Sequence, residues 1–158
     1  MVNDTETKTP AHFTLQEVVA RSGLSEHTLR YYERIGLLEP VKRDDSSNHR
    51  RYTEEDLWKI ESLACLRTTG MSIDDMRKYF ALLKEGKTAA DQQLELFEAQ
   101  RKALEREIAQ KQEHLHYLEQ KVAYWQAVQR GDDAKAREIG EIATGLAKQI
   151  ITEDKMYS

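Results

Sequence analysis

Apolar residues recur at alternating steps of three and four along the second half of the chain. Eight of the ten positions in this repeat are apolar, and Glu, Gln, Lys, Arg and His fill the positions between them. The apolar positions are Leu94, Phe97, Leu104, Ile108, Leu115, Leu118, Val122 and Trp125. Arg101 and Lys111 occupy the other two and can set the register and the partner of a coiled coil. This heptad predicts a helix over residues 89–129, roughly 60 Å long at 1.5 Å per residue.

Such a helix needs a partner for its apolar stripe. It cannot bury a stripe of that length on one small domain, and a coiled coil supplies the facing helix. The alternative is one helix of an intramolecular bundle, but too little chain remains to supply the other helices. The pattern therefore predicts a homodimer held by the eight apolar heptad positions.

Two short helices joined by a tight turn are predicted within residues 13–38. Thr14 is a suitable cap for the first helix, and Gly23 supplies the permissive backbone that the turn needs. Ser25 can cap the second helix, about residues 26–34. A helix-turn-helix places a second helix of this kind in the major groove of DNA, where Arg and hydroxyl groups meet phosphates and base edges.

A polar turn with cations on both sides follows the two helices. Asp, Ser and Asn residues fill positions 44–48, which marks a loop, and Lys42-Arg43 and His49-Arg50-Arg51 flank it. We expect short strands on either side to form a hairpin, or wing, whose cations reach the sugar-phosphate backbone. Thr53 then caps a third helix over about 54–68, and a fourth helix follows over about 73–83.

The first half of the chain resembles the DNA-binding domain of the MerR family of bacterial transcription regulators. The run from Thr28 to Leu38, TLRYYERIGLL, is similar to the recognition-helix signature of that family. Asn48, Arg50 and Tyr52 fit its wing, although many members have a glycine and an apolar residue where this chain has Asn48 and His49. The resemblance implies a mainly α fold: a winged helix-turn-helix followed by a long dimerisation helix that pairs antiparallel with its partner.

Residues and resemblance together give one set of candidate contacts to double-stranded promoter DNA. The set is Thr14, Ser25, Thr28, Arg30, Tyr31, Tyr32, Arg34, Lys42, Arg43, His49, Arg50, Arg51 and Tyr52. The resemblance also implies a mechanism, in which the dimer bends and untwists an over-long promoter spacer so that RNA polymerase engages both elements.

Composition adds bounds to this picture. A net charge of −4 argues against indiscriminate nucleic-acid binding, but seven basic residues against five acidic ones lie between Arg21 and Arg51. No apolar run approaches the roughly 18 residues of a membrane helix, and the polar residues 1–12 contain no signal peptide. We therefore expect a cytoplasmic protein with no membrane partner.

Four regions are expected along the chain. Residues 1–12 form a disordered tail, 13–86 the DNA-binding domain, 87–130 the dimerisation helix, and 131–158 one short amphipathic helix with a tail. The apolar residues of that last helix are Ile139, Ile142, Ala143, Leu146 and Ile150, which share a face and can pack back on the end of the coiled coil.

Cys65 is the one cysteine of the chain. On a wheel of the third helix it lies away from the apolar half, so it is either exposed or covered by a partner. A lone cysteine can be a small packing residue. It can also be a sensor thiol, which needs a nearby cation to favour its thiolate, and Arg67 and Arg77 are the candidates.

The residues around Cys65 are similar to a MerR subgroup that responds to aldehydes and other electrophiles through a cysteine at this place. The resemblance implies the same role for Cys65 and implies that the protein acts in a stress response. Metal sensing is disfavoured, because a zinc or copper site needs several soft ligands and His114 and His116 point to different helix faces. No cofactor and no enzymatic constellation is expected. The alternatives are a regulator with a non-thiol signal and an architectural DNA-binding protein without an inducer.

Overall fold

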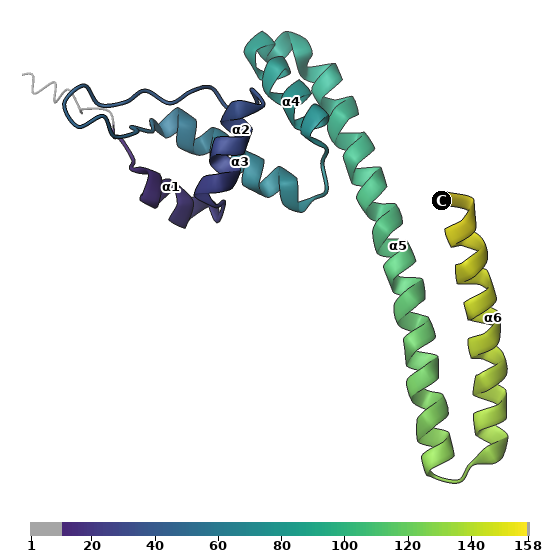
Figure 1. Cartoon of the computed structure of the whole chain (residues 1–158). Helices are drawn as coiled ribbons and strands as arrows, with labels where there is room; N and C mark the ends of the chain where they lie inside the picture. Colours follow the sequence, from purple (N-terminus) through teal and green to yellow (C-terminus); the bar gives the residue numbers. More distant parts are fainter. Residues whose placement is uncertain (1–10, 158) are drawn as a thin grey trace, which may run out of the picture. The chain divides into compact units, whose positions relative to one another are not determined.

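The computed structural model describes residues 11–157, so most of the tail predicted to be disordered lies outside the described residues. The fold is helical, as the sequence predicts (Figure 1). The helices are α1 (Leu15–Ser22), α2 (Glu26–Arg34), α3 (Glu54–Thr68), α4 (Ile73–Glu85), the short 3₁₀ helix η1 (Gly86–Ala89), α5 (Ala90–Gln129) and α6 (Asp133–Tyr157). Within residues 11–157, no helix is both long and apolar enough to cross a membrane.

Side-chain caps begin the first four helices. The Thr14 hydroxyl accepts a hydrogen bond from the Glu17 N–H, and the Glu17 carboxylate accepts from the Thr14 N–H, which closes a capping box. Ser25 caps α2, Thr53 caps α3 and Ser72 caps α4 through the same kind of bond. These local interactions confirm the predicted starts of the four helices.

A single apolar core joins these four helices. Leu29 and Tyr32 of α2 lie in it with Leu57, Ile60 and Leu63 of α3. The complete set of buried residues is Val18, Leu24, Leu29, Tyr32, Leu37, Leu38, Tyr52, Leu57, Ile60, Leu63, Met71 and Met76. Because α2 is anchored from behind by Leu29 and Tyr32, its opposite face is presented to solvent in a fixed orientation.

The wing (residues 42–51) differs from the prediction in having no strands. Among the described residues, the β contacts are two isolated antiparallel bridges, Arg43 with Arg50 and Phe13 with Tyr52. The wing backbone closes through the Asp44 N–H to the His49 carbonyl at 2.8 Å and the Arg51 N–H to the Lys42 carbonyl at 2.9 Å. A ladder this short leaves the wing dependent on side-chain contacts for its position.

The first compact unit extends to Gln100, beyond the predicted domain boundary at residue 86. The start of α5 packs against the preceding helices, because Leu96 is buried and the Phe97 ring meets the Tyr79 ring edge-on at 5.2 Å. Gln93 donates to the Tyr79 carbonyl, and Gln100 donates to the Thr69 carbonyl at 2.6 Å. These contacts explain why the division falls inside α5.

The second unit, residues 101–158, is a helical hairpin of the rest of α5 and α6. The prediction of one short C-terminal helix with a tail is wrong, since α6 is a 25-residue helix that runs back beside α5 (Figure 1). Ala127 of α5 is buried together with Ala136 and Ile139 of α6. Ile139, Ala143, Leu146 and Ile150 face α5 as predicted, but Ile142 is exposed. The face of α6 that packs on α5 therefore includes four of the five predicted apolar positions and leaves out Ile142.

Candidate nucleic-acid interface

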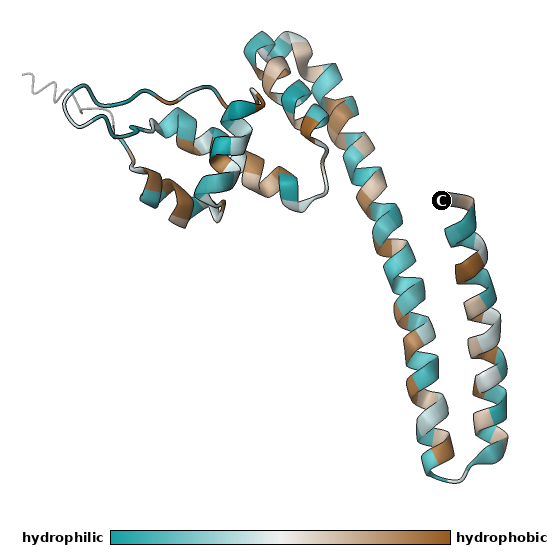
Figure 2. Ribbon diagram, viewed as in Figure 1, coloured by the Kyte–Doolittle hydropathy of each residue, from teal (hydrophilic) through white to brown (hydrophobic). Residues whose placement is uncertain are grey.

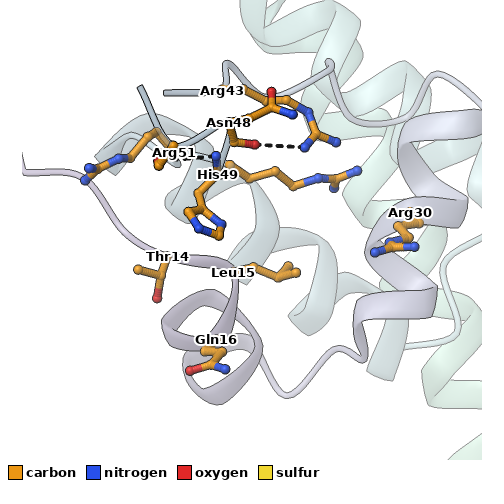
Figure 3. Close-up of a pocket in the computed structure, with 10 residues that line it drawn as sticks. Thr14, Leu15, Gln16, Arg30, Arg43, Asn48, His49 and Arg51 are labelled. Carbon is orange, nitrogen blue, oxygen red and sulfur yellow. Dashed lines mark hydrogen bonds between the residues drawn. The ribbon is translucent and has the colours of Figure 1, made fainter. Parts of the chain in front are cut away.

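A concave groove of about 550 Å³ lies between α1, α2 and the wing. Figure 3 shows Arg30 projecting from α2 on one side and Arg43, His49 and Arg51 of the wing on the other. The lining residues are Thr14, Leu15, Gln16, Arg30, Arg43, Ser47, Asn48, His49, Arg50 and Arg51. The groove is therefore lined by four arginines and a histidine, the cationic residue types that bind polyanions such as nucleic acids.

Arg30 lies on the exposed face of α2. Its guanidinium pairs with Glu26 one turn earlier on the same helix, and both side chains are exposed. An exposed pair of this kind contributes little to stability, so a DNA base or phosphate can replace Glu26 as the partner of Arg30 at small cost. Arg34, one turn further along, stacks its guanidinium over the Tyr31 ring with 5.5 Å to the centroid.

The tip of the wing is a turn organised by Asp44. Its carboxylate accepts hydrogen bonds from the Ser46 hydroxyl and from the backbone N–H groups of Ser47 and Ser46, which hold the pKa of Asp44 well below its usual range. Asn48 has φ of 55°, in the left-handed region. Asparagine tolerates this conformation better than other residues with a side chain. The glycine-to-asparagine difference in the wing is therefore compatible with the same backbone turn.

Arg43 and Arg51 are held within the wing itself. Arg43 Nη1 donates to the Asn48 carbonyl at 3.0 Å, and Arg51 Nη2 lies 3.2 Å from Asp44 Oδ2. Both arginines remain exposed. These bonds orient the two guanidinium groups and leave each with further N–H donors for a phosphate.

Arg50 behaves differently from its neighbours. Its Nη1 donates to Glu33 Oε1 of α2 at 2.8 Å, and the two side chains are only 18% and 16% exposed. The hydroxyl of Tyr52 and the carboxylate of Glu33 raise the pKa of Arg50. The predicted grip of Arg50 on a phosphate stays a prediction, and in this structure its guanidinium is engaged inside the protein.

The structure divides the predicted contact residues by exposure. Thr14, Ser25, Arg30, Arg34, Lys42, Arg43, His49 and Arg51 are exposed, and Thr28, Tyr31 and Arg50 are partly buried. Tyr32 and Tyr52 are 4% and 1% exposed, so their prediction as DNA contacts is corrected: their rings belong to the core. The Ser25 hydroxyl is also occupied, since it accepts from the Thr28 N–H and pairs with the Thr28 hydroxyl at 2.9 Å.

Four residues that line the groove are absent from the predicted DNA contacts, namely Leu15, Gln16, Ser47 and Asn48, of which Ser47 and Asn48 belong to the wing turn. Leu15 and Gln16, in the first turn of α1, line the groove opposite the wing (Figure 3). Gln16 could have been predicted from the sequence. Thr14, a predicted contact, caps α1, and Gln16 is the next polar residue at that end of the helix. What the sequence does not show is that the wing folds toward this end of α1.

Cys65 is exposed on α3, which confirms its predicted placement away from the core. Its carbonyl accepts a hydrogen bond from the Thr68 hydroxyl at 2.6 Å. Of the two predicted neighbouring cations, Arg77 donates to the Ile35 carbonyl at 2.8 Å. Because its side chain is accessible, the Cys65 thiol can be reached by a small electrophile.

The heptad positions of α5 stay exposed. The eight apolar side chains range from 37% exposed for Phe97 and Leu104 to 61% for Leu94 and Trp125. Helix α6 packs on the other side of α5, where Ala127 is buried with Ala136 and Ile139 of α6. Ala109, Glu113 and His116 of α5 line one pocket together with Leu146 and Ile150 of α6. Figure 2 shows hydrophobic segments recurring along α5. Helix α6 therefore does not cover the row of eight apolar heptad side chains on α5, which we call the seam.

Within the described part of the chain, no three His, Cys, Asp or Glu side chains gather as a possible metal site. The candidate chemistry is therefore that of cationic groups facing a groove, an accessible thiol and an apolar helix seam.

Comparisons with known proteins bear on this arrangement. Residues 13–83 match the family described as MerR HTH family regulatory protein. An uncharacterized HTH-type transcriptional regulator of Haemophilus influenzae is 35% identical over 130 residues, covering 82% of this chain and 96% of that protein. The HTH-type transcriptional regulator AdhR of Bacillus subtilis is 47% identical over 72 residues, covering 46% of this chain and 51% of that protein.

A solved structure is similar to most of this chain. The crystal structure of HiNmlR, a MerR family regulator lacking the sensor domain and bound to promoter DNA, has a TM-score of 0.67 and 33% sequence identity. The match covers 82% of this chain and 96% of that one.

Proposed function

Because this chain belongs to the MerR family of helix-turn-helix transcriptional regulators, we propose that it binds double-stranded promoter DNA through α2 and the wing. It is a DNA-binding transcriptional regulator and not an enzyme. The observation that carries the proposal is the groove lined by Arg30 of α2 and by Arg43, His49 and Arg51 of the wing. A DNA-bound relative, HiNmlR, supports it.

We assign base and backbone contacts to different elements. Arg30 and Tyr31 lie on the recognition helix, and Arg30 can form a bidentate contact with a guanine edge. Thr28 is the alternative base reader. Lys42, Arg43, His49 and Arg51 project from the wing, where cations contact phosphates and fix register without reading sequence.

Two substitutions test this division. Arg30→Gln should weaken binding by about 1–3 kcal/mol and relax the sequence preference at one position. Arg51→Gln should weaken all duplexes alike and lower the slope of log affinity against log salt by about 1. Fluorescence anisotropy with the promoter upstream of the protein's own gene measures both, and Lys148→Gln on α6 is the matched control. If both variants bind as the wild type does, the groove is not the DNA-binding surface.

We propose further that the active form is a homodimer paired antiparallel along α5. Support comes from the eight exposed apolar heptad positions and from α6, which covers the other side of the same helix. Pairing places two DNA-binding units in a twofold relation, as DNA half-sites require. Bending and untwisting the promoter then costs a few kcal/mol, supplied by protein contacts, and lets RNA polymerase engage both promoter elements.

Cys65 is the proposed receiver of the signal. Addition of its thiol to an aldehyde forms a bond from Sγ to the carbonyl carbon, and the carbonyl oxygen takes up the thiol proton. The exposed position of Cys65 on α3 supports this role. A difference of a few kcal/mol between two states of the dimer suffices to move most of the population.

Induction in cells expressing Cys65→Ser tests the signal. The variant should bind DNA with wild-type affinity and fail to activate its promoter when methylglyoxal or formaldehyde is added. Anisotropy on the purified variant is the control for DNA binding. A variant that still responds makes Cys65 a packing residue and favours a non-thiol signal. A wild type that binds DNA with no response to any electrophile favours an architectural role.

A further inference from the structure

The recognition helix and the wing are separate segments that must meet one DNA duplex together. Helix α2 is anchored in the core by Leu29 and Tyr32. The wing has a single bridge between its two arms, Arg43 with Arg50, and its tip is exposed from Asp45 to His49. Its backbone therefore supplies little to hold it at one angle to α2.

A side-chain ion pair joins these two elements. Arg50 Nη1 of the wing lies 2.8 Å from Glu33 Oε1 of α2, across 17 positions of sequence. The side chains are 18% and 16% exposed, far less than those of the Arg30–Glu26 and Arg51–Asp44 pairs, where the arginines are 62% and 47% exposed. Shielding from water makes the attraction stronger and more directional than at the open surface.

Tyr52 completes the support behind Arg50. Its hydroxyl lies 3.5 Å from Arg50 Nη1, and its ring is buried in the core. The Tyr52 backbone is in turn fixed to Phe13 by hydrogen bonds of 2.8 and 3.0 Å. Arg50 is thus held between a core residue at the base of the wing and a carboxylate on the recognition helix.

We propose that Glu33 and Arg50 are positioning residues that lock the wing to the recognition helix, so that both elements reach one duplex without rearrangement. This inference rests on the proposed DNA binding and replaces the phosphate contact predicted for Arg50. A pre-positioned wing avoids the cost of ordering that segment when DNA binds. Arg43, His49 and Arg51 then carry the phosphate contacts that this arrangement presents.

The positioning role and a direct phosphate role predict opposite results for Glu33→Gln. If Arg50 grips phosphate, removal of the Glu33 charge frees Arg50 and leaves DNA affinity unchanged or higher. If the pair holds the wing, Glu33→Gln lowers affinity about tenfold, equal to about 1.4 kcal/mol. The salt slope stays at the wild-type value, because no phosphate contact is lost, whereas loss of a phosphate contact lowers it by about 1.

Glu26→Gln is the matched control. It removes the same charge from the same helix, but from a pair that lies within α2. We expect it to keep wild-type affinity or to exceed it. The double variant Glu33→Gln with Arg50→Gln should bind no more weakly than the weaker single variant, because both changes remove one interaction. Additive losses would overturn the positioning role.

Amide hydrogen exchange tests the inference without DNA. In Glu33→Gln, exchange should accelerate at the wing amides of Asp44 and Arg51, which close its backbone, and remain unchanged along α3. Glu26→Gln should leave both regions as in the wild type. Unchanged wing exchange in Glu33→Gln would overturn the proposal even if the variant binds weakly. A wild type that binds no promoter DNA would instead refute the proposed function, while the exchange result still decides the role of the pair.

Discussion

The two compact units of this chain differ in how much of their apolar surface they bury. The N-terminal unit encloses a core in which Val18, Leu29 and Leu63 are fully buried. The C-terminal hairpin buries small groups such as Ala127 and leaves Leu115, Leu118 and Val122 57% exposed. The first unit encloses its own core and presents charges to its surroundings, while the second leaves a row of large apolar side chains exposed along α5.

The strongest way to break this comparison is to replace apolar seam residues by charges. Leu104→Glu with Leu115→Glu should convert the proposed dimer, with an expected mass near twice 18.4 kDa, to a monomer, because two carboxylates per chain would be buried without partners. Sedimentation at micromolar concentration measures the mass, and anisotropy should show loss of DNA binding. The N-terminal core should remain folded.

Arg106→Glu is the matched control for that experiment, since position 106 lies opposite the seam in the heptad. It should sediment as the wild type does. A monomeric wild type would contradict the idea that the seam is an interface between two copies.

Core truncations sharpen the comparison through the cost of a lost side chain. Leu63→Ala in the first unit should lower the free energy of unfolding by about 2–5 kcal/mol, as expected where neighbours cannot collapse onto the cavity. Ile139→Ala in the hairpin should cost less, because it is 7% exposed and packs in a thin two-helix layer.

The two tryptophans allow the unfolding of each unit to be followed separately by fluorescence. Trp58 lies in the first unit and Trp125 in the second, so Trp58→Phe and Trp125→Phe each leave one reporter. Urea unfolding followed by fluorescence should show Leu63→Ala shifting the Trp58 transition and Ile139→Ala the Trp125 transition. Coincident transitions in all variants would mean that the units unfold as one.

The contact of α5 with the first unit gives a smaller effect. Gln100→Ala removes the hydrogen bond from Gln100 to the Thr69 carbonyl, which should cost about 1 kcal/mol and raise hydrogen exchange in the first turns of α5. Gln112→Ala, on the part of α5 in the hairpin, is the control. Equal exchange in the two variants would place the boundary between the units elsewhere.

The smallest effect concerns the pH dependence of the wing. The pKa of Asp44 is lowered by the Ser46 hydroxyl and the Ser47 and Ser46 N–H groups, so its contribution to wing stability is fully present above the unfolded pKa, about 3.9. The contribution falls as pH drops through the lower folded value. NMR of the Ser46 and Ser47 amides should show an ordered turn at pH 4, and Asp44→Asn should show that turn weakened at neutral pH. An Asp44 resonance titrating at the ordinary pKa would contradict this.

The first four helices and α5 were predictable from the sequence, as were six of the ten residues that line the groove. The caps Thr14, Ser25, Thr53 and Ser72 were predictable because each bonds to a backbone group three residues away. The heptad of α5 was predictable because helical period alone places its positions on one side. Tyr32 and Tyr52 were misjudged, because a tyrosine beside arginines in sequence can face the core as readily as DNA.

What the sequence by itself determined, therefore, is the set of helices, their starting points, the apolar seam and the position of Cys65 away from the core. The tertiary structure decided that Arg50 meets Glu33 across 17 residues, that α5 remains tied to the first unit as far as Gln100, and that α6 covers the side of α5 opposite the seam. The physical reason is range. Caps and helical periods act over three or four residues, whereas these contacts depend on how segments far apart in the chain pack around a common core.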